Sequence, residues 1–149
     1  MVSTHVWVAP APIATDRFRG RPLRPAAAAV AALGVCLLVN VVDPNEPGSF
    51  GTCPFLWATG LDCPGCGTLR ALRAATRGDL ALAADHNLLT LLLLPLLVAA
   101  LVTWWQAERG TRPDVLRLPW LAPALALVVP VFWVARNLPW FAWLGAGAA

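Results

Sequence analysis

Three of the four cysteines lie close together in the chain, between two apolar segments. Cys53 is followed ten residues later by the sequence Cys63-Pro-Gly-Cys66-Gly67. Cysteines at this spacing can form a disulfide, take part in thiol–disulfide exchange or bind a soft metal ion. Any chemistry that this protein performs is therefore expected in this segment.

The residues alone leave three interpretations of these cysteines open. A structural disulfide joining Cys53 to Cys63 or Cys66 is expected if the segment faces an oxidising compartment. A thiol-redox site is expected if Cys63 stands at a helix N-terminus, where the peptide dipoles lower the pKa of a thiol. A zinc or copper site is expected if His86 adds a fourth ligand to the three cysteines. The cofactor is thus none, zinc or copper.

Four polar residues are predicted to gather beside the cysteines, each near the end of a helix. They are Arg70, Asn87, Arg136 and Asn137. Such a group could bind an anionic headgroup or a carbonyl substrate. Because most side-chain hydrogen bonds go to the backbone or to water, the sequence favours a structural role in capping helices and tying loops together. No Ser-His-Asp set, carboxylate pair or nucleotide fingerprint accompanies them, so a non-enzymatic protein is favoured.

The composition indicates an all-α integral membrane protein. Of the 149 residues, 58% are hydrophobic and 13% are charged, whereas soluble domains carry about 25% charged residues. The net charge of +3 is concentrated in arginines near the N-terminus. That distribution suits an anionic membrane surface, and no nucleic-acid-binding motif is present.

Three transmembrane helices are predicted, at residues 26–42, 88–105 and 118–135. The first has 17 uncharged residues, or about 26 Å of helix, which is just enough to cross a bilayer. The prolines within the later spans are tolerated in membrane helices because neighbouring groups satisfy the freed carbonyls. Residues 1–25 are predicted to be a disordered basic tail, and residues 26–149 a single membrane domain.

A short amphipathic helix is predicted within the first loop, which covers residues 43–87. Cys63 would precede this helix, and Pro64 would take its first position, where proline fits. The helical spacing then brings Arg70, Arg73 and Arg77 to one side. Arg70 is expected to be the most sensitive of the three to substitution, because it lies one turn from the second cysteine of the motif.

The arginine distribution predicts the orientation of the chain. All eleven basic residues are arginine; seven precede the first span or lie between the second and third, and four lie elsewhere. Cytoplasmic loops carry the excess of basic residues. The N-terminus is therefore expected in the cytoplasm of a bacterial cell, and the cysteine loop and the C-terminus outside a multi-pass inner-membrane protein.

The cysteine segment resembles the bacterial family called domain of unknown function 2752. This resemblance rests on Cys53-Pro54, Thr59-Gly60, Cys63-Pro-Gly-Cys66-Gly67, Thr68, Arg70-Ala71, Gly78-Asp79, Ala83 and Asn87. Members of the family are small membrane proteins, and Leu88 stands where the family often has proline. The resemblance implies the architecture and the choice of residues, and it implies no reaction.

Two functions follow as hypotheses. The first is an accessory or scaffold protein of the bacterial inner membrane, whose external cysteine loop docks a partner or lipid. Its partners would be the lipid bilayer and either another membrane protein or a second copy of the chain. The alternative is a thiol-redox or metal-handling membrane protein that uses Cys53, Cys63 and Cys66.

Overall fold

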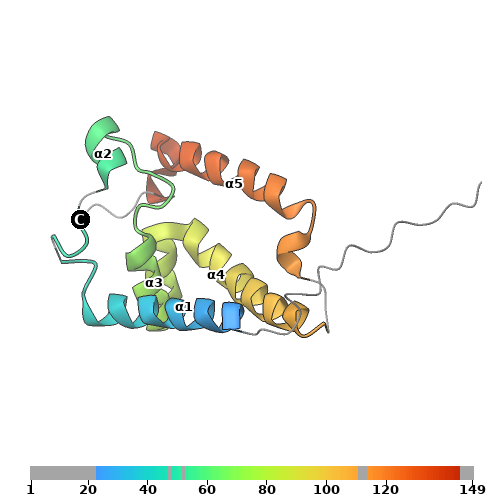
Figure 1. Cartoon of the computed structure of the whole chain (residues 1–149). Helices are drawn as coiled ribbons and strands as arrows, with labels where there is room; N and C mark the ends of the chain where they lie inside the picture. Colours follow the sequence, from blue (N-terminus) through green and yellow to red (C-terminus); the bar gives the residue numbers. More distant parts are fainter. Residues whose placement is uncertain (1–22, 47, 52, 111–113, 145–149) are drawn as a thin grey trace, which may run out of the picture.

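The computed structural model describes residues 23–46, 48–51, 53–110 and 114–144, and this part of the chain is helical and contains no strand (Figure 1). The predicted all-α fold class is confirmed for these residues. Most of the predicted N-terminal tail, residues 1–22, lies outside the described residues.

Helix α1 covers Leu23–Val41, so it begins three residues before the predicted first span. Most of its side chains are exposed, and only Pro25 and Val39 are buried. The helix ends at the turn that follows, where Asp43 Oδ1 accepts a hydrogen bond of 2.9 Å from the Asn45 N–H group. Such aspartate turns compete with helical hydrogen bonding and end the helix.

The first loop contains two short helices, α2 at Pro54–Thr59 and α3 at Thr68–Thr76. The prediction that α3 would start at Pro64 is wrong. Two successive turns occupy that segment, with the Cys66 N–H bonded to the Cys63 carbonyl and the Thr68 N–H to the Gly65 carbonyl. Gly67 then takes the left-handed conformation at φ 80°, which interrupts a helix and strongly favours glycine.

Helix α4 covers Leu80–Glu108 and is bent near its start. The Asp79 side chain caps its N-terminus by accepting a 2.9 Å hydrogen bond from the Leu82 N–H. Asn87 is not helical, with φ −164° and ψ 97°. The helix therefore consists of a short segment before Asn87 and a long apolar segment after it.

Helix α5 covers Leu121–Arg136 and lies between two 3-10 helices, η2 at Val115–Arg117 and η3 at Pro139–Leu144. The predicted third span began at residue 118. Leu118 is extended in the structure, at φ −66° and ψ 124°, because the residue before a proline is disfavoured in the helical conformation. The helix consequently starts three residues late.

Two helices, α1 and α4, are long and apolar enough to cross a membrane by length and composition. Helix α5 is apolar but has 16 residues, or about 24 Å, which is shorter than the roughly 30 Å hydrocarbon core. Among the described residues, the structure therefore has two helices of full-span length instead of the predicted three, and α5 is a shorter apolar helix.

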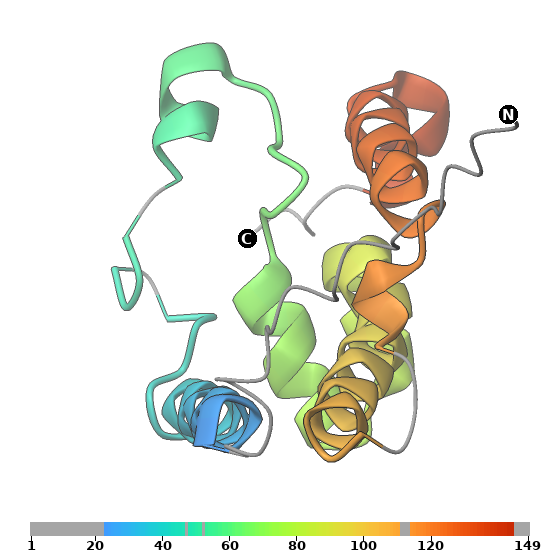
Figure 2. The same ribbon diagram turned by 45° about the vertical axis from the view of Figure 1, so that its right-hand side comes forward.

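The helices form two groups. Helices α1, α3 and α4 lie side by side, and α5 lies on the other side of the molecule (Figures 1 and 2). Little of the apolar surface is buried: Ala71 of α3 and Ala83 of α4 are fully buried, while many leucines and valines of α1, α4 and α5 are exposed. A soluble monomer rarely exposes so much contiguous apolar surface, so the arrangement is compatible with a membrane protein.

Candidate metal centre at the cysteine loop

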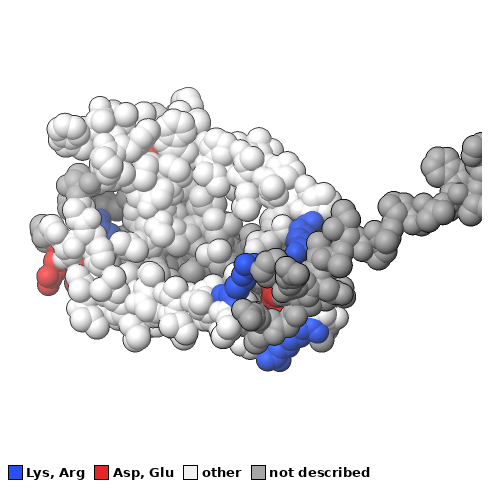
Figure 3. All heavy atoms as spheres, viewed as in Figure 1, with Lys and Arg blue, Asp and Glu red and all other residues white. Residues whose placement is uncertain are grey.

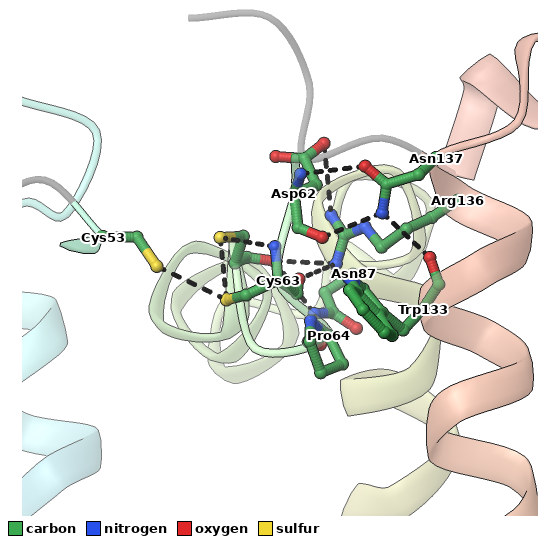
Figure 4. A network of polar contacts seen from close by, with 9 residues as sticks. Cys53, Asp62, Cys63, Pro64, Asn87, Trp133, Arg136 and Asn137 are labelled. Atoms are coloured by element: carbon green, nitrogen blue, oxygen red, sulfur yellow. Dashed lines mark hydrogen bonds and ion pairs between the residues drawn. The ribbon is translucent and has the colours of Figure 1, made fainter. Parts of the chain in front are cut away.

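The structure brings the three loop cysteines together (Figure 4). The Sγ atom of Cys63 lies 2.9 Å from that of Cys66 and 3.6 Å from that of Cys53. All three sulfur atoms lie within 4.8 Å of one another. Each cysteine is partly buried and is a free thiol, since a disulfide bond is only about 2.05 Å long. The predicted disulfide is therefore absent from the described part of the chain.

The turn between Cys63 and Cys66 makes two of these sulfur atoms neighbours. The Cys63 N–H group donates a 3.3 Å hydrogen bond to the Cys66 sulfur, and the Cys66 N–H donates to the Cys63 carbonyl at 3.1 Å. Cys53 approaches from a separate segment and directly precedes α2, where Pro54 takes the first helical position. The cluster thus depends on how the loop returns from α2 to α3.

Asn87 connects the cysteine turn to the bend in α4. Its Nδ2 atom donates hydrogen bonds to the carbonyls of Pro64 at 3.0 Å and Cys66 at 2.9 Å. Its Oδ1 atom accepts a 2.9 Å hydrogen bond from the Thr90 N–H group, which caps the apolar segment that follows. The side chain is fully buried, and both its amide nitrogen and its amide oxygen are hydrogen-bonded.

Arg136, in the last turn of α5, holds the same turn from the other side (Figure 4). Its Nη1 atom donates hydrogen bonds to the carbonyls of Cys63 at 3.0 Å and Cys66 at 3.2 Å. The guanidinium lies over the Phe132 ring, 5.3 Å from its centre. Its Nη2 atom is 4.0 Å from Asp62 Oδ2, and the arginine side chain is fully buried.

Asn137 binds the residue just before the motif. Its Oδ1 atom accepts a hydrogen bond from the Asp62 N–H at 2.9 Å, and its Nδ2 atom donates to the Asp62 carbonyl at 2.9 Å. Nδ2 also donates to the Trp133 carbonyl at 2.9 Å. Three of the four predicted polar residues, from two helices far apart in sequence, therefore converge on residues 62–66.

Arg70 and His86 do not join this group. Arg70 Nε donates to the Pro44 carbonyl at 3.2 Å, beyond the end of α1. His86 is not among the described residues whose ligand atoms cluster with the cysteine sulfurs, and its Nδ1 atom is buried without a hydrogen-bond partner. His86 lies directly before the bend at Asn87. Sequence periodicity did not reveal this bend, so the position of His86 relative to the cysteines could not be predicted.

Two residues of the site were missed by the sequence analysis, Asp62 and Trp133. Asp62 offers its backbone to Asn137 and its carboxylate to Arg136. Its position directly before Cys63 is the signal that could have identified it. Trp133 packs edge-on against Phe55 of α2, with the ring centres 5.7 Å apart, and nothing in the sequence pairs these two residues.

The thiols differ in their acidity. Burial, together with the hydrogen bond shared with Cys63, raises the pKa of the Cys66 thiol to about 12. The Cys53 side chain makes no capping hydrogen bond to α2, but the nearby Leu56 N–H group still lowers the pKa of its thiol. The helix N-terminus beside the cluster therefore favours the Cys53 thiolate, whereas the redox interpretation had expected Cys63 at a helix N-terminus.

This arrangement can hold a metal ion that prefers sulfur. A zinc–sulfur bond of about 2.3 Å in tetrahedral geometry separates its sulfur ligands by about 3.8 Å. The separations found here, from 2.9 Å to at most 4.8 Å, bracket that value. Small movements of the three side chains would equalise them around one ion.

Residues 53–101 match the family model described as "Protein of unknown function (DUF2752)", which confirms the predicted resemblance of this segment to that family. The matched segment contains the three cysteines and Asn87, and it ends within α4. Arg136 and Asn137 lie outside it. No curated protein and no solved structure gives a significant match to the chain.

Proposed function

We propose that this chain is a membrane-anchored protein that binds one soft metal ion, zinc or monovalent copper, through Cys53, Cys63 and Cys66. The observation that carries the proposal is the convergence of three sulfur atoms within 4.8 Å. A disulfide would use two thiols and leave the third unused, whereas a metal ion uses all three. Thiolates are the protein ligands that zinc and copper(I) prefer.

The polar groups around the cluster support this proposal. Asn87 and Arg136 both bind the Cys66 carbonyl, and Asn137 binds the backbone of Asp62 on the other side of the turn. Outer groups that fix the ligand-bearing backbone commonly strengthen metal sites. The two cysteines of the turn are therefore held in place by helix ends rather than by a mobile loop.

The apolar surface supports a membrane location. On the face shown in Figure 3, the middle of the molecule is free of charged side chains, and most arginine atoms gather at the end where α4 stops and α5 begins. Helices α1 and α4 are each long enough to cross the apolar layer. Their exposed leucines and valines would contact lipid tails instead of water.

The orientation is part of the same proposal. The Val115 N–H donates to Thr103 Oγ1 at 3.3 Å, near the end of α4, while Asn137 lies at the cysteine turn. Helix α5 thus returns from the arginine-rich end to the cysteine end. Because basic residues favour the cytoplasmic side, we assign the cysteine loop to the outer face of a bacterial inner membrane.

A docking role for the same loop is favoured by one observation. Trp57 in α2 and Trp140 in η3 are 83% and 81% exposed, and both elements adjoin the cysteine turn. Exposed tryptophans are enriched at membrane interfaces and in protein contacts. An accessory protein that docks a lipid surface or a partner is the second candidate, and it does not require a metal.

Metal stoichiometry separates the two candidates. The full chain is purified in detergent under reducing conditions, loaded with zinc, and analysed by native mass spectrometry. We expect one ion per chain, lost when Cys53, Cys63 or Cys66 is replaced by serine. Cys36→Ser is the matched control, because Cys36 lies within α1 and the variant should retain the ion.

A metal-free protein would overturn the metal proposal. If such a protein carried a reactive, low-pKa loop cysteine, the thiol-redox alternative would take its place, whereas an inert disulfide between two loop cysteines under non-reducing conditions would favour the docking role. If its cysteines stayed reduced and unreactive, the docking role would remain. Retention of the ion by all three serine variants would assign the metal to other residues.

A further inference from the structure

Arg136 is a buried charge whose hydrogen-bonding capacity is only partly used. Its side chain is fully buried, and the guanidinium stays charged at any physiological pH. Among the described residues, its Nε and Nη2 atoms have no hydrogen-bond partner. The nearest carboxylate oxygen, Asp62 Oδ2, is 4.0 Å away, which is too far for a hydrogen bond.

Arg73 is a second nearly buried arginine, and its charge is paired directly with a carboxylate. Arg73 donates to the Val39 carbonyl at 2.9 Å and forms an ion pair of 2.8 Å with Asp43. Its side chain is 11% exposed, so it is nearly as buried as Arg136. The difference lies in the distance to the carboxylate, which is 2.8 Å for Arg73 and 4.0 Å for Arg136.

We infer that Arg136 is a positioning residue whose counter-charge is the metal-loaded group of three thiolates. The inference rests on the proposed metal function. When one zinc or monovalent copper ion replaces the protons of three thiols, three S–H bonds break, three metal–sulfur bonds form and three protons pass to solvent. The product carries one net negative charge with zinc and two with monovalent copper. The buried guanidinium, which is bonded to the carbonyls of two ligand-bearing residues, then gains this anion as a counter-charge in addition to the distant carboxylate of Asp62.

The location of the guanidinium supports this role. Its Nη1 atom holds the carbonyls of Cys63 and Cys66, the two residues that carry two of the three sulfur ligands. The charge of Arg136 is therefore fixed to the backbone that presents the ligands. Loading the site would stabilise this charge, and the charge would in turn retain the metal ion.

The test measures zinc affinity in the full chain by competition with a chromophoric chelator. Arg136→Gln keeps a donor for the carbonyls but removes the charge, and Arg136→Lys keeps the charge but loses the planar fork. We expect affinity to fall about 10- to 100-fold in Arg136→Gln, the range typical of outer groups. Arg136→Lys should recover part of that loss. Arg73→Gln, the matched control, should keep the wild-type affinity.

A second measurement guards against a variant that folds poorly. The midpoint of thermal unfolding is recorded with and without zinc for each protein, so that each variant is compared with its own metal-free form. The shift caused by zinc should be smaller in Arg136→Gln than in wild type and Arg73→Gln. A purely structural arginine would lower both midpoints and leave the shift unchanged.

Two failures are distinguishable. If the wild-type chain binds no zinc, the proposed metal function fails and this inference fails with it. If the wild type binds zinc and Arg136→Gln has the same affinity and the same zinc-induced shift, only the role of Arg136 is overturned. An equal loss in Arg73→Gln would likewise overturn it, because the effect would then reflect general stability.

Discussion

The two ends of the molecule are held together in different ways. At the cysteine end, side chains of Asn87, Arg136 and Asn137 bind backbone groups of residues 62–66, across more than twenty positions in sequence. At the opposite end, the described contacts are mostly local, such as the Arg109 guanidinium over the Trp105 ring at 4.9 Å. Among the described residues, the long-range polar contacts are thus concentrated at the candidate site and between the end of α1 and α3.

This difference indicates where the chain needs a fixed geometry. Apolar helices in a bilayer are placed by lipid and by packing, and need few specific polar contacts. A group of three sulfur ligands, by contrast, requires a defined backbone. This contrast fits the proposed function, in which Asn87, Arg136 and Asn137 would fix the turn that carries two of the ligands and lipid would hold the apolar helices.

The largest expected effect concerns which end faces outward. A reporter fused after Gln106 should be active only in the cytoplasm, and one fused after Ala149 only outside, because arginines concentrate near the former end. The measurement is a paired phosphatase and fluorescent-protein assay in intact cells. If both fusions report from the same side, α5 does not return to the cysteine end in the membrane.

Removing Asn87 should weaken the cysteine end most. Asn87→Ala leaves the carbonyls of Pro64 and Cys66 and the N–H of Thr90 without this partner. Leaving buried polar groups unsatisfied costs about 1–3 kcal/mol each, before relaxation. We expect a clear drop in unfolding midpoint and in cellular abundance, measured by thermal unfolding and immunoblotting.

Asn45→Ala is the control for that substitution. Asn45 also makes amide hydrogen bonds, but in an exposed turn with Asp43, and exposed changes usually alter stability by less than about 0.5 kcal/mol. An equal effect of the two alanine substitutions would remove the contrast between a buried network and a surface turn.

The arginines of α3 should rank differently from the sequence-based expectation. Arg73 is nearly buried and bonds both Val39 and Asp43, so Arg73→Gln should cost about 1–3 kcal/mol of unfolding free energy. Arg70→Gln loses one carbonyl contact and should cost about 1 kcal/mol. Arg77→Gln, at an exposed position, should be nearly neutral in chemical denaturation. A ranking with Arg70 first would restore the original expectation.

The smallest effect concerns the order of thiol alkylation in reduced, metal-free protein. Because the pKa of Cys53 is lowered and that of Cys66 is raised to about 12, the Cys53 thiolate forms at lower pH. Mass spectrometry after brief alkylation should find Cys53 modified at lower pH than Cys66, which should be modified only as the pH approaches about 12. Equal rates for both cysteines would contradict the assigned environments.

Sequence reasoning predicted which residues lie close together better than it described the fold around them. The cysteines were found by spacing, and Asn87, Arg136 and Asn137 by their positions at predicted helix ends. The start of α3 was wrong because Gly67 adopts a left-handed conformation, which spacing does not reveal. Arg70 was predicted to lie beside the cysteines, but it contacts the Pro44 carbonyl. This contact depends on how the end of α1 packs near α3, and the sequence does not show contacts between such distant segments.

The length of α5 shows the same limit. Hydropathy predicted a span from residue 118, but the extended Leu118 before Pro119 delays the helix. Hydropathy indicates whether a segment is more stable in an apolar environment than in water. The residue at which a helix starts depends instead on local backbone sterics. The bend at Asn87 likewise arises from side-chain bonds to a loop twenty residues away, which periodicity within the helix cannot encode.

The buried alanines of α3 and α4 have a consequence for how closely the cysteine turn approaches the bend in α4. These two helices contact each other more extensively than any other pair of elements, and their buried residues include Ala71, Ala74 and Ala83. Small side chains allow helix backbones to approach closely. Cys66 lies two residues before α3, and Asn87 lies four residues after Ala83. A larger side chain at these alanines would push the two helices apart and stretch the hydrogen bonds from Asn87 to the carbonyls of Pro64 and Cys66.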